Sequence, residues 1–182
     1  MTTGSSRAGA AARIVPRPVA TVALTWLTMV GVDFFLHAGL LAPLYDWDSP
    51  FLLRPAEAFV RIPIGYVSFL VLAIALAWLL HRLTVERGRE GALIAGACGA
   101  VIWGALLVGL WSISTAAPGL LLGWWVGQTV ELALGGLVIG SLAGGATVRS
   151  LAWKIAGLLV VGAVSAIALQ TIGYAQAPVL VQ

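Results

Sequence analysis

Four polar side chains, three of them ionisable, stand inside stretches of the sequence that are otherwise apolar. They are Asp33, His37, Gln128 and Glu131. Asp33 and His37 are four residues apart, so on a helix they share one face and can hydrogen-bond to each other. Gln128 and Glu131 are three residues apart and share a face in the same way. Two carboxylates and an imidazole can bind protons, a cation or another polar substrate.

Apolar stretches of this kind are typical of membrane-spanning helices. Polar groups inside such a helix cost free energy, and they usually face the interior of the helix bundle. A carboxylate in the middle of a bilayer costs about 2.5–3.5 kcal/mol on the insertion scale. Asp33 and His37 lie in one apolar stretch, and Gln128 and Glu131 lie in another that would cross the membrane in the opposite direction. Counted from the ends of these stretches, Asp33 and Glu131 lie at similar depth in the membrane, and His37 and Gln128 lie about one helical turn further toward the outer surface. We therefore expect the two pairs to meet. Either they line a transport site, or they tie two helices together by hydrogen bonds.

The amino-acid composition indicates an integral membrane protein. Of the 182 residues, 60% are hydrophobic and only 9% are charged, whereas a soluble domain carries about 25% charged residues. The net charge of +3 lies in short connectors, with no basic stripe, so we predict no nucleic-acid partner.

Five apolar stretches are each long enough to cross a bilayer, which takes about 20 residues as a helix. We predict an all-α, polytopic bundle of five transmembrane helices, spanning roughly residues 19–44, 62–83, 91–113, 120–146 and 151–174.

The segment Pro50–Arg61 mixes apolar residues with Arg54, Glu57 and Arg61 at helical spacings. We expect a short helix lying in the interface, followed by a second span with Pro63 in its first turn. The alternative is that this segment extends the second span at its N-terminal end.

The domain organisation follows from these spans. We expect a disordered cytoplasmic tail over residues 1–17, a single transmembrane domain over 18–175, and a short extracytoplasmic tail over 176–182. Arginines gather before the first span, between the second and third, and between the fourth and fifth. By the positive-inside rule the N-terminus is cytoplasmic and the C-terminus extracytoplasmic.

Glycines spaced by four residues predict close helix contacts, because small residues let helix backbones approach each other in lipid. The fourth stretch carries two such rows. The helix-packing residues are Gly123, Gly127 and Gly135 in one row, and Gly136, Gly140 and Gly144 in the other. Glu131 falls in the first row. The partner of each row can be the same chain, a second copy or another membrane protein.

Enzyme motifs are absent, including a nucleophile elbow, a P-loop and a dinucleotide fingerprint. One histidine and two carboxylates can bind a divalent ion, but there is no HxxxH or HExxH. We therefore predict no metal and no cofactor. The leading hypothesis is a small transporter or channel-like protein. The alternative is a non-catalytic accessory or scaffold subunit, and a lipid-modifying membrane enzyme ranks third.

The stretches Val32-Asp33-Phe34-Phe35 and Ala42-Pro43-Leu44-Tyr45 resemble the first helix of a family of small bacterial inner-membrane proteins. That family is catalogued only as a domain of unknown function. Glu131 and Gly135 match its last helix loosely, and Phe34 and Phe35 stand where it tends to have a tryptophan. The resemblance covers roughly residues 20–145. It implies a location in the bacterial cytoplasmic (inner) membrane and a four-helix core with a fifth span added, and it implies no known activity.

Overall fold

The computed structural model describes residues 17–45 and 49–175, so the predicted tails over 1–16 and 176–182 lie outside the described residues. The described chain is helical and contains no strand. Its elements are α1 (Arg17–Phe35), the π-helical turn η2 (Leu36–Leu40), the 3₁₀ turn η3 (Ala42–Leu44), α2 (Pro55–Arg82), α3 (Gly88–Ile113), α4 (Pro118–Ala143) and α5 (Val148–Thr171).

Five helical segments of 24 or 26 residues are long and apolar enough to span a membrane. This confirms the predicted all-α bundle of membrane-length helices. Half of the most apolar stretch of α4 is buried inside the protein, against a third or less in the other four. A helix that shows so little surface lies at the centre of a bundle, whereas the other four present broad apolar faces outward.

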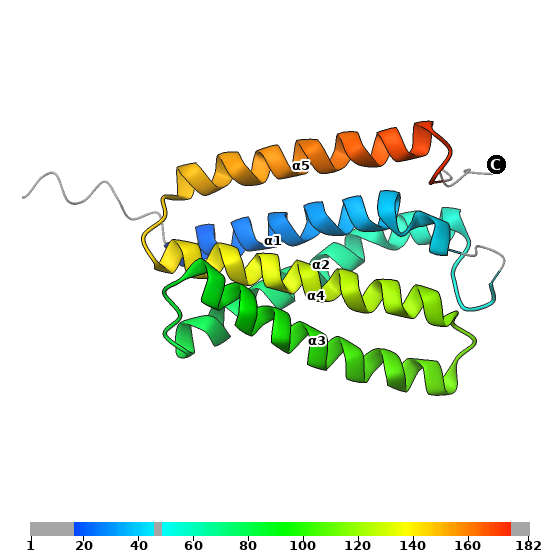
Figure 1. The fold of residues 1–182 in the computed structure, drawn as a ribbon, viewed down its shortest axis with the longest axis horizontal. Coiled ribbons are helices and arrows are strands. Elements are labelled where there is room, and N and C mark those ends of the chain that lie inside the picture. The colour runs from blue at the N-terminus through cyan, green and yellow to red at the C-terminus, as the bar shows by residue number, and fades with distance from the viewer. Residues whose placement is uncertain (1–16, 46–48, 176–182) are drawn as a thin grey trace, which may run out of the picture.

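The helices lie in the order α5, α1, α4 and α3 across the bundle, with α2 behind α1 and α4 (Figure 1). Helix α4 contacts α1, α2 and α3, whereas α5 packs mainly on α1 and η2. The seam between α1 and α4 therefore runs through the middle of the molecule.

One glycine row of α4 packs on α3. A methyl group added to Gly136 would collide with the carbonyl oxygen of Gly91, and one on Gly140 with the carbonyl oxygen of Arg87. Gly144 stands in the same relation to the carbonyl oxygen of Glu86. Backbones this close need glycine, so the row occupies a contact within the chain.

The other glycine row of α4 faces the first helix and its exit. A methyl group on Gly127 would lie 3.3 Å from Leu36, and one on Gly135 would lie 3.2 Å from Thr25. Gly123 packs against Leu41 and Leu44 in the same manner. This row lets α1, η2 and η3 lie directly on α4.

The predicted separate interfacial helix is wrong, and the alternative of an extended second helix is confirmed. Helix α2 is continuous from Pro55, so Pro63 lies in its interior rather than in its first turn. Between Pro55 and Gly65 there is no Gly, Asn, Asp or Ser to supply a turn. Arg54 and Glu57 form an ion pair of 3.5 Å at the start of α2, as their spacing predicts.

Candidate functional site

A π-helical turn at the end of α1 positions His37. The N–H of Leu41 bonds to the carbonyl of Leu36 at 2.7 Å, five residues back, in place of the usual four. From α5, Gln170 Nε2 donates to the carbonyl oxygen of Ala38 at 2.9 Å, which satisfies an acceptor in the widened turn. Single π turns inside helices occur frequently at functional sites.

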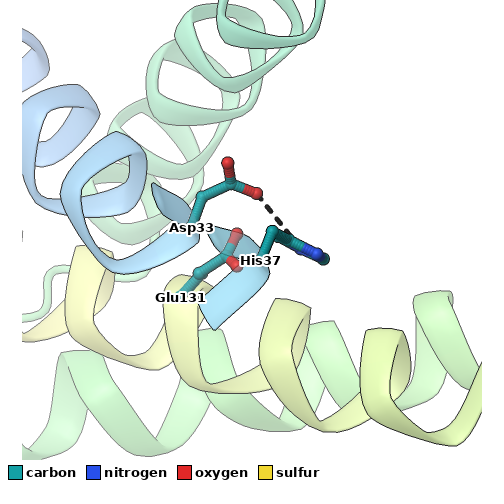
Figure 2. Close-up of side chains that lie close together, drawn as sticks. All are labelled: Asp33, His37 and Glu131. Carbon is teal, nitrogen blue, oxygen red and sulfur yellow. Dashed lines mark ion pairs between the residues drawn. The ribbon is translucent and has the colours of Figure 1, made fainter. Parts of the chain in front are cut away.

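Asp33 of α1, His37 of η2 and Glu131 of α4 lie together at the α1–α4 seam, as Figure 2 shows. One potential ligand atom from each residue lies within 4.8 Å of the other two. His37 Nε2 stands 3.3 Å from Asp33 Oδ1. The i,i+4 spacing and the similar depth of the two helices therefore bring the three ionisable groups to one place.

Glu131 is the deepest member of the cluster. It is 0% exposed, and neither carboxylate oxygen has a hydrogen-bond partner among the described residues. The side chains of Asp33 and His37 are 17% and 23% exposed. A buried polar atom without a partner costs about 1–3 kcal/mol, so native proteins keep few of them without a reason.

Two further polar groups along α1 and α4 are in the same condition. Gln128 is 7% exposed and Thr25 is 0% exposed. Neither Gln128 Oε1 nor Thr25 Oγ1 has a partner within the part of the chain that the structure describes. Among the described residues, the helices at the seam therefore carry two unpaired buried polar atoms in addition to those of Glu131.

Tyr45 and Trp124 hold His37 from the side opposite Asp33. The hydroxyl of Tyr45 hydrogen-bonds to His37 Nδ1, and Trp124 Nε1 donates to the same hydroxyl at 2.9 Å. Burial raises the pKa of the Tyr45 hydroxyl to about 12, so it keeps its proton at neutral pH. The sequence analysis did not predict a role at the site for either aromatic residue. Tyr45 lies eight residues after His37, and this short separation is the one sequence signal that could have found it.

Within the described part of the chain, no lysine or arginine pairs with either acid. Among the described residues the ion pairs are His37–Asp33 and Arg54–Glu57, so neither Asp33 nor Glu131 meets a lysine or arginine. Two carboxylates in a low-dielectric seam must then carry protons or lie beside a bound cation.

Two cavities lie elsewhere on the molecule. One, of about 860 Å³, opens between the start of α1 and the ends of α2 and α4, and its polar lining includes Arg17, His81 and Glu86. We call it the Arg17 vestibule. The other, of about 400 Å³, lies between the C-terminal half of α3 and the N-terminal half of α4 and has an almost wholly apolar lining. Neither cavity is lined by the cluster residues.

Fold and site together define a helical membrane protein with a buried polar cluster between two of its helices. No family model, curated protein or solved structure matches the chain. The resemblance to the family of unknown function stays a prediction.

Proposed function

We propose that this chain is a small transport protein of the bacterial inner membrane that binds a cation at Asp33, His37 and Glu131. The observation that carries the proposal is the Glu131 carboxylate, which is fully buried and lacks a hydrogen-bond partner among the described residues. A residue kept to tie helices together would spend its oxygens on hydrogen bonds across the seam. An acid kept for a ligand leaves them open.

The route that we propose follows the α1–α4 seam. Thr21 lines the Arg17 vestibule, and Thr25, Met29 and Asp33 follow at successive four-residue steps along α1. Each step advances about 6 Å along the helix. Thr25 and Met29 are 0% exposed, so they close the seam between the vestibule and the cluster in this conformation. Transport then requires this pair of side chains to move.

The proposed orientation places the vestibule in the cytoplasm. Basic residues cluster at its end of the bundle, at the start of α1, between α2 and α3, and between α4 and α5. They are Arg17, Arg82, Arg87, Arg89 and Arg149. Positive residues in short loops stay cytoplasmic, so the cluster and Tyr45 lie toward the outer half of the membrane.

Flux through purified protein in liposomes tests the proposal. Proton uptake and divalent-cation uptake are followed in parallel with dyes enclosed in the vesicles. Asp33→Asn and Glu131→Gln keep the size of each side chain and remove its charge. We expect each to reduce the wild-type flux by tenfold or more, because each removes one of the groups that holds the cation.

Glu90→Gln is the matched control, since Glu90 is an exposed acid in the first turn of α3. It should transport at the wild-type rate. Flux that is absent in the wild-type protein, or that survives unchanged in Asp33→Asn and Glu131→Gln, contradicts the proposal.

The accessory-subunit alternative rested on glycine-rich helix faces in need of a partner. Gly136, Gly140 and Gly144 lie against α3 and the connector that precedes it, and Gly123, Gly127 and Gly135 lie against the α1 side of the bundle. Contacts within the chain already occupy both rows, so the rows give that alternative no support.

A further inference from the structure

The cluster has the donor set, charge and supporting contacts of a divalent transition-metal site. We propose that Asp33, His37 and Glu131 bind Zn²⁺ or a chemically similar divalent transition-metal cation, which is the cargo of the transport protein proposed above. This inference rests on that proposed function. It departs from the sequence-based prediction of no metal, which followed from the missing short motifs.

The spacing of the donors fits a metal ion. Zinc binds histidine nitrogen and carboxylate oxygen at about 2.0–2.2 Å, which places tetrahedral ligands about 3.4 Å apart. His37 Nε2 and Asp33 Oδ1 are already 3.3 Å apart. The largest separation within the trio, 4.8 Å, requires only a small side-chain adjustment toward a common centre.

Charge selects a divalent ion. When both carboxylates are ionised, they and a neutral imidazole sum to −2, which a single divalent cation cancels. No lysine or arginine pairs with either acid among residues 17–45 and 49–175. The fully buried and unpartnered Glu131 carboxylate is the group that such an ion would satisfy.

Donor chemistry then selects the kind of divalent ion. Calcium takes six to eight oxygen ligands and magnesium keeps several waters, so neither prefers a site built on an imidazole. Imidazole suits zinc, iron, copper and nickel, and mixed nitrogen and oxygen donors are typical of zinc sites. His37 therefore distinguishes this cluster from an all-oxygen site.

Tyr45 supplies the supporting contact that metal-binding histidines need. A ligating histidine almost always donates its other ring N–H to a fixed acceptor, which orients the ring. With Nε2 on the metal, His37 Nδ1 would donate to the Tyr45 hydroxyl. A hydroxyl oxygen has two acceptor lone pairs, so Tyr45 can accept from both His37 and Trp124. Tyr45 thus acts as a positioning residue for the proposed ligand.

The test is Zn²⁺ binding to untagged, full-length protein in detergent, measured by calorimetry, with Co²⁺ absorption as a report of coordination geometry. We expect one ion per chain. Glu131→Gln and His37→Gln should each weaken binding by at least tenfold and remove the Co²⁺ visible bands. Tyr45→Phe should weaken it by about 10–100-fold, the usual effect of losing the hydrogen-bond partner of a metal-binding histidine.

His81→Gln is the matched control, because His81 is the other histidine of the chain and is exposed at the end of α2. Its Zn²⁺ affinity should equal that of wild type, and gel filtration verifies that every variant stays folded. Wild-type protein that binds Zn²⁺ no better than Glu131→Gln overturns this inference.

The two proposals fail in different ways. Liposomes that transport protons with protein that binds no Zn²⁺ would retain the transport function and remove the metal. Stoichiometric Zn²⁺ binding without any flux would retain the metal site and remove the transport function.

Discussion

At the scale of single residues, the site consists of a trio of ionisable groups and two aromatic residues that orient it. Glu131 is buried without a hydrogen-bond partner among the described residues, while Asp33 and His37 pair with each other and stay partly exposed. Asp33 and His37 therefore form the more exposed side of the cluster, and Glu131 forms its deep end.

Two adjacent tryptophans provide a matched test of the role of Tyr45 and Trp124 beside His37. Trp124 Nε1 donates to the Tyr45 hydroxyl, and Trp125 Nε1 donates to the backbone carbonyl of Ala100, each at 2.9 Å. Replacing either with Phe removes one hydrogen bond, worth about 0.5–1.5 kcal/mol. We expect both variants to lose similar stability in thermal unfolding, and only Trp124→Phe to slow cation flux several-fold. Equal flux in the two variants would contradict the role given to Tyr45 and Trp124.

Part of the site could be predicted from the sequence. The i,i+4 spacing of Asp33 and His37, and the place of Glu131 in a glycine row, were sufficient to predict that the three would meet. The hydrogen bond from Trp124 to Tyr45 was not predictable, because it joins residues that lie 79 positions apart. The hydrogen bond between Tyr45 and His37 was not predictable either, because it depends on the turns that follow His37. The sequence also could not predict that the Glu131 carboxylate lacks hydrogen-bond partners among the described residues, because this depends on how the helices pack.

At the scale of elements, α4 is the helix on which the others are assembled. One of its glycine rows contacts α3 and the other contacts α1, η2 and η3. Both rows were visible in the sequence, since a four-residue period of small residues needs no knowledge of the partner. Which row faces which helix, and the continuity of α2 through Pro63, came only from the assembled bundle.

The α3–α4 contact predicts a steep penalty for a single methyl group. Gly136→Ala places a Cβ against the backbone of Gly91, and overpacking of this kind costs about 1–3 kcal/mol. Gly109→Ala is the control, because nothing lies within 4 Å of its added Cβ. Thermal unfolding in detergent should show a lower midpoint for Gly136→Ala and an equal or higher one for Gly109→Ala. An unchanged midpoint for Gly136→Ala would rule out the described contact.

The π turn predicts a role for Gln170 of α5. Gln170→Leu leaves the carbonyl of Ala38 without its side-chain donor, at a cost of about 1–3 kcal/mol for an unsatisfied buried group. We expect flux to fall with stability, since η2 carries His37. Thr171→Val serves as control, because Thr171 bonds only to the carbonyl of Ile167 within its own helix. Wild-type flux from Gln170→Leu would separate the π turn from function.

At the scale of the whole molecule, five membrane-length helices follow directly from apolar runs of sequence, and their existence was the most predictable feature. The boundaries of these helices were less predictable, because apolar and polar residues mix near the membrane–water interface. The largest difference is in α2, which begins at Pro55 rather than near residue 62.

The proposed orientation makes a prediction for surface labelling. In a Cys98→Ala background, Thr115→Cys in the α3–α4 connector should react with a membrane-impermeant maleimide added to intact cells. Glu86→Cys in the α2–α3 connector should react only after permeabilisation, because its loop carries Arg87 and Arg89. The reverse pattern would place the N-terminus outside.

The central claim is that Glu131 is kept for a ligand rather than for the fold, and the unfolding temperature of Glu131→Gln in detergent with chelator tests it most directly. A buried acid without partners contributes nothing to holding the helices together, so removing its charge should leave the midpoint unchanged or raise it by a few degrees, about 2–4 °C per kcal/mol. A fall of similar size would mean that the carboxylate holds the bundle together, and the account of a cation site would be contradicted.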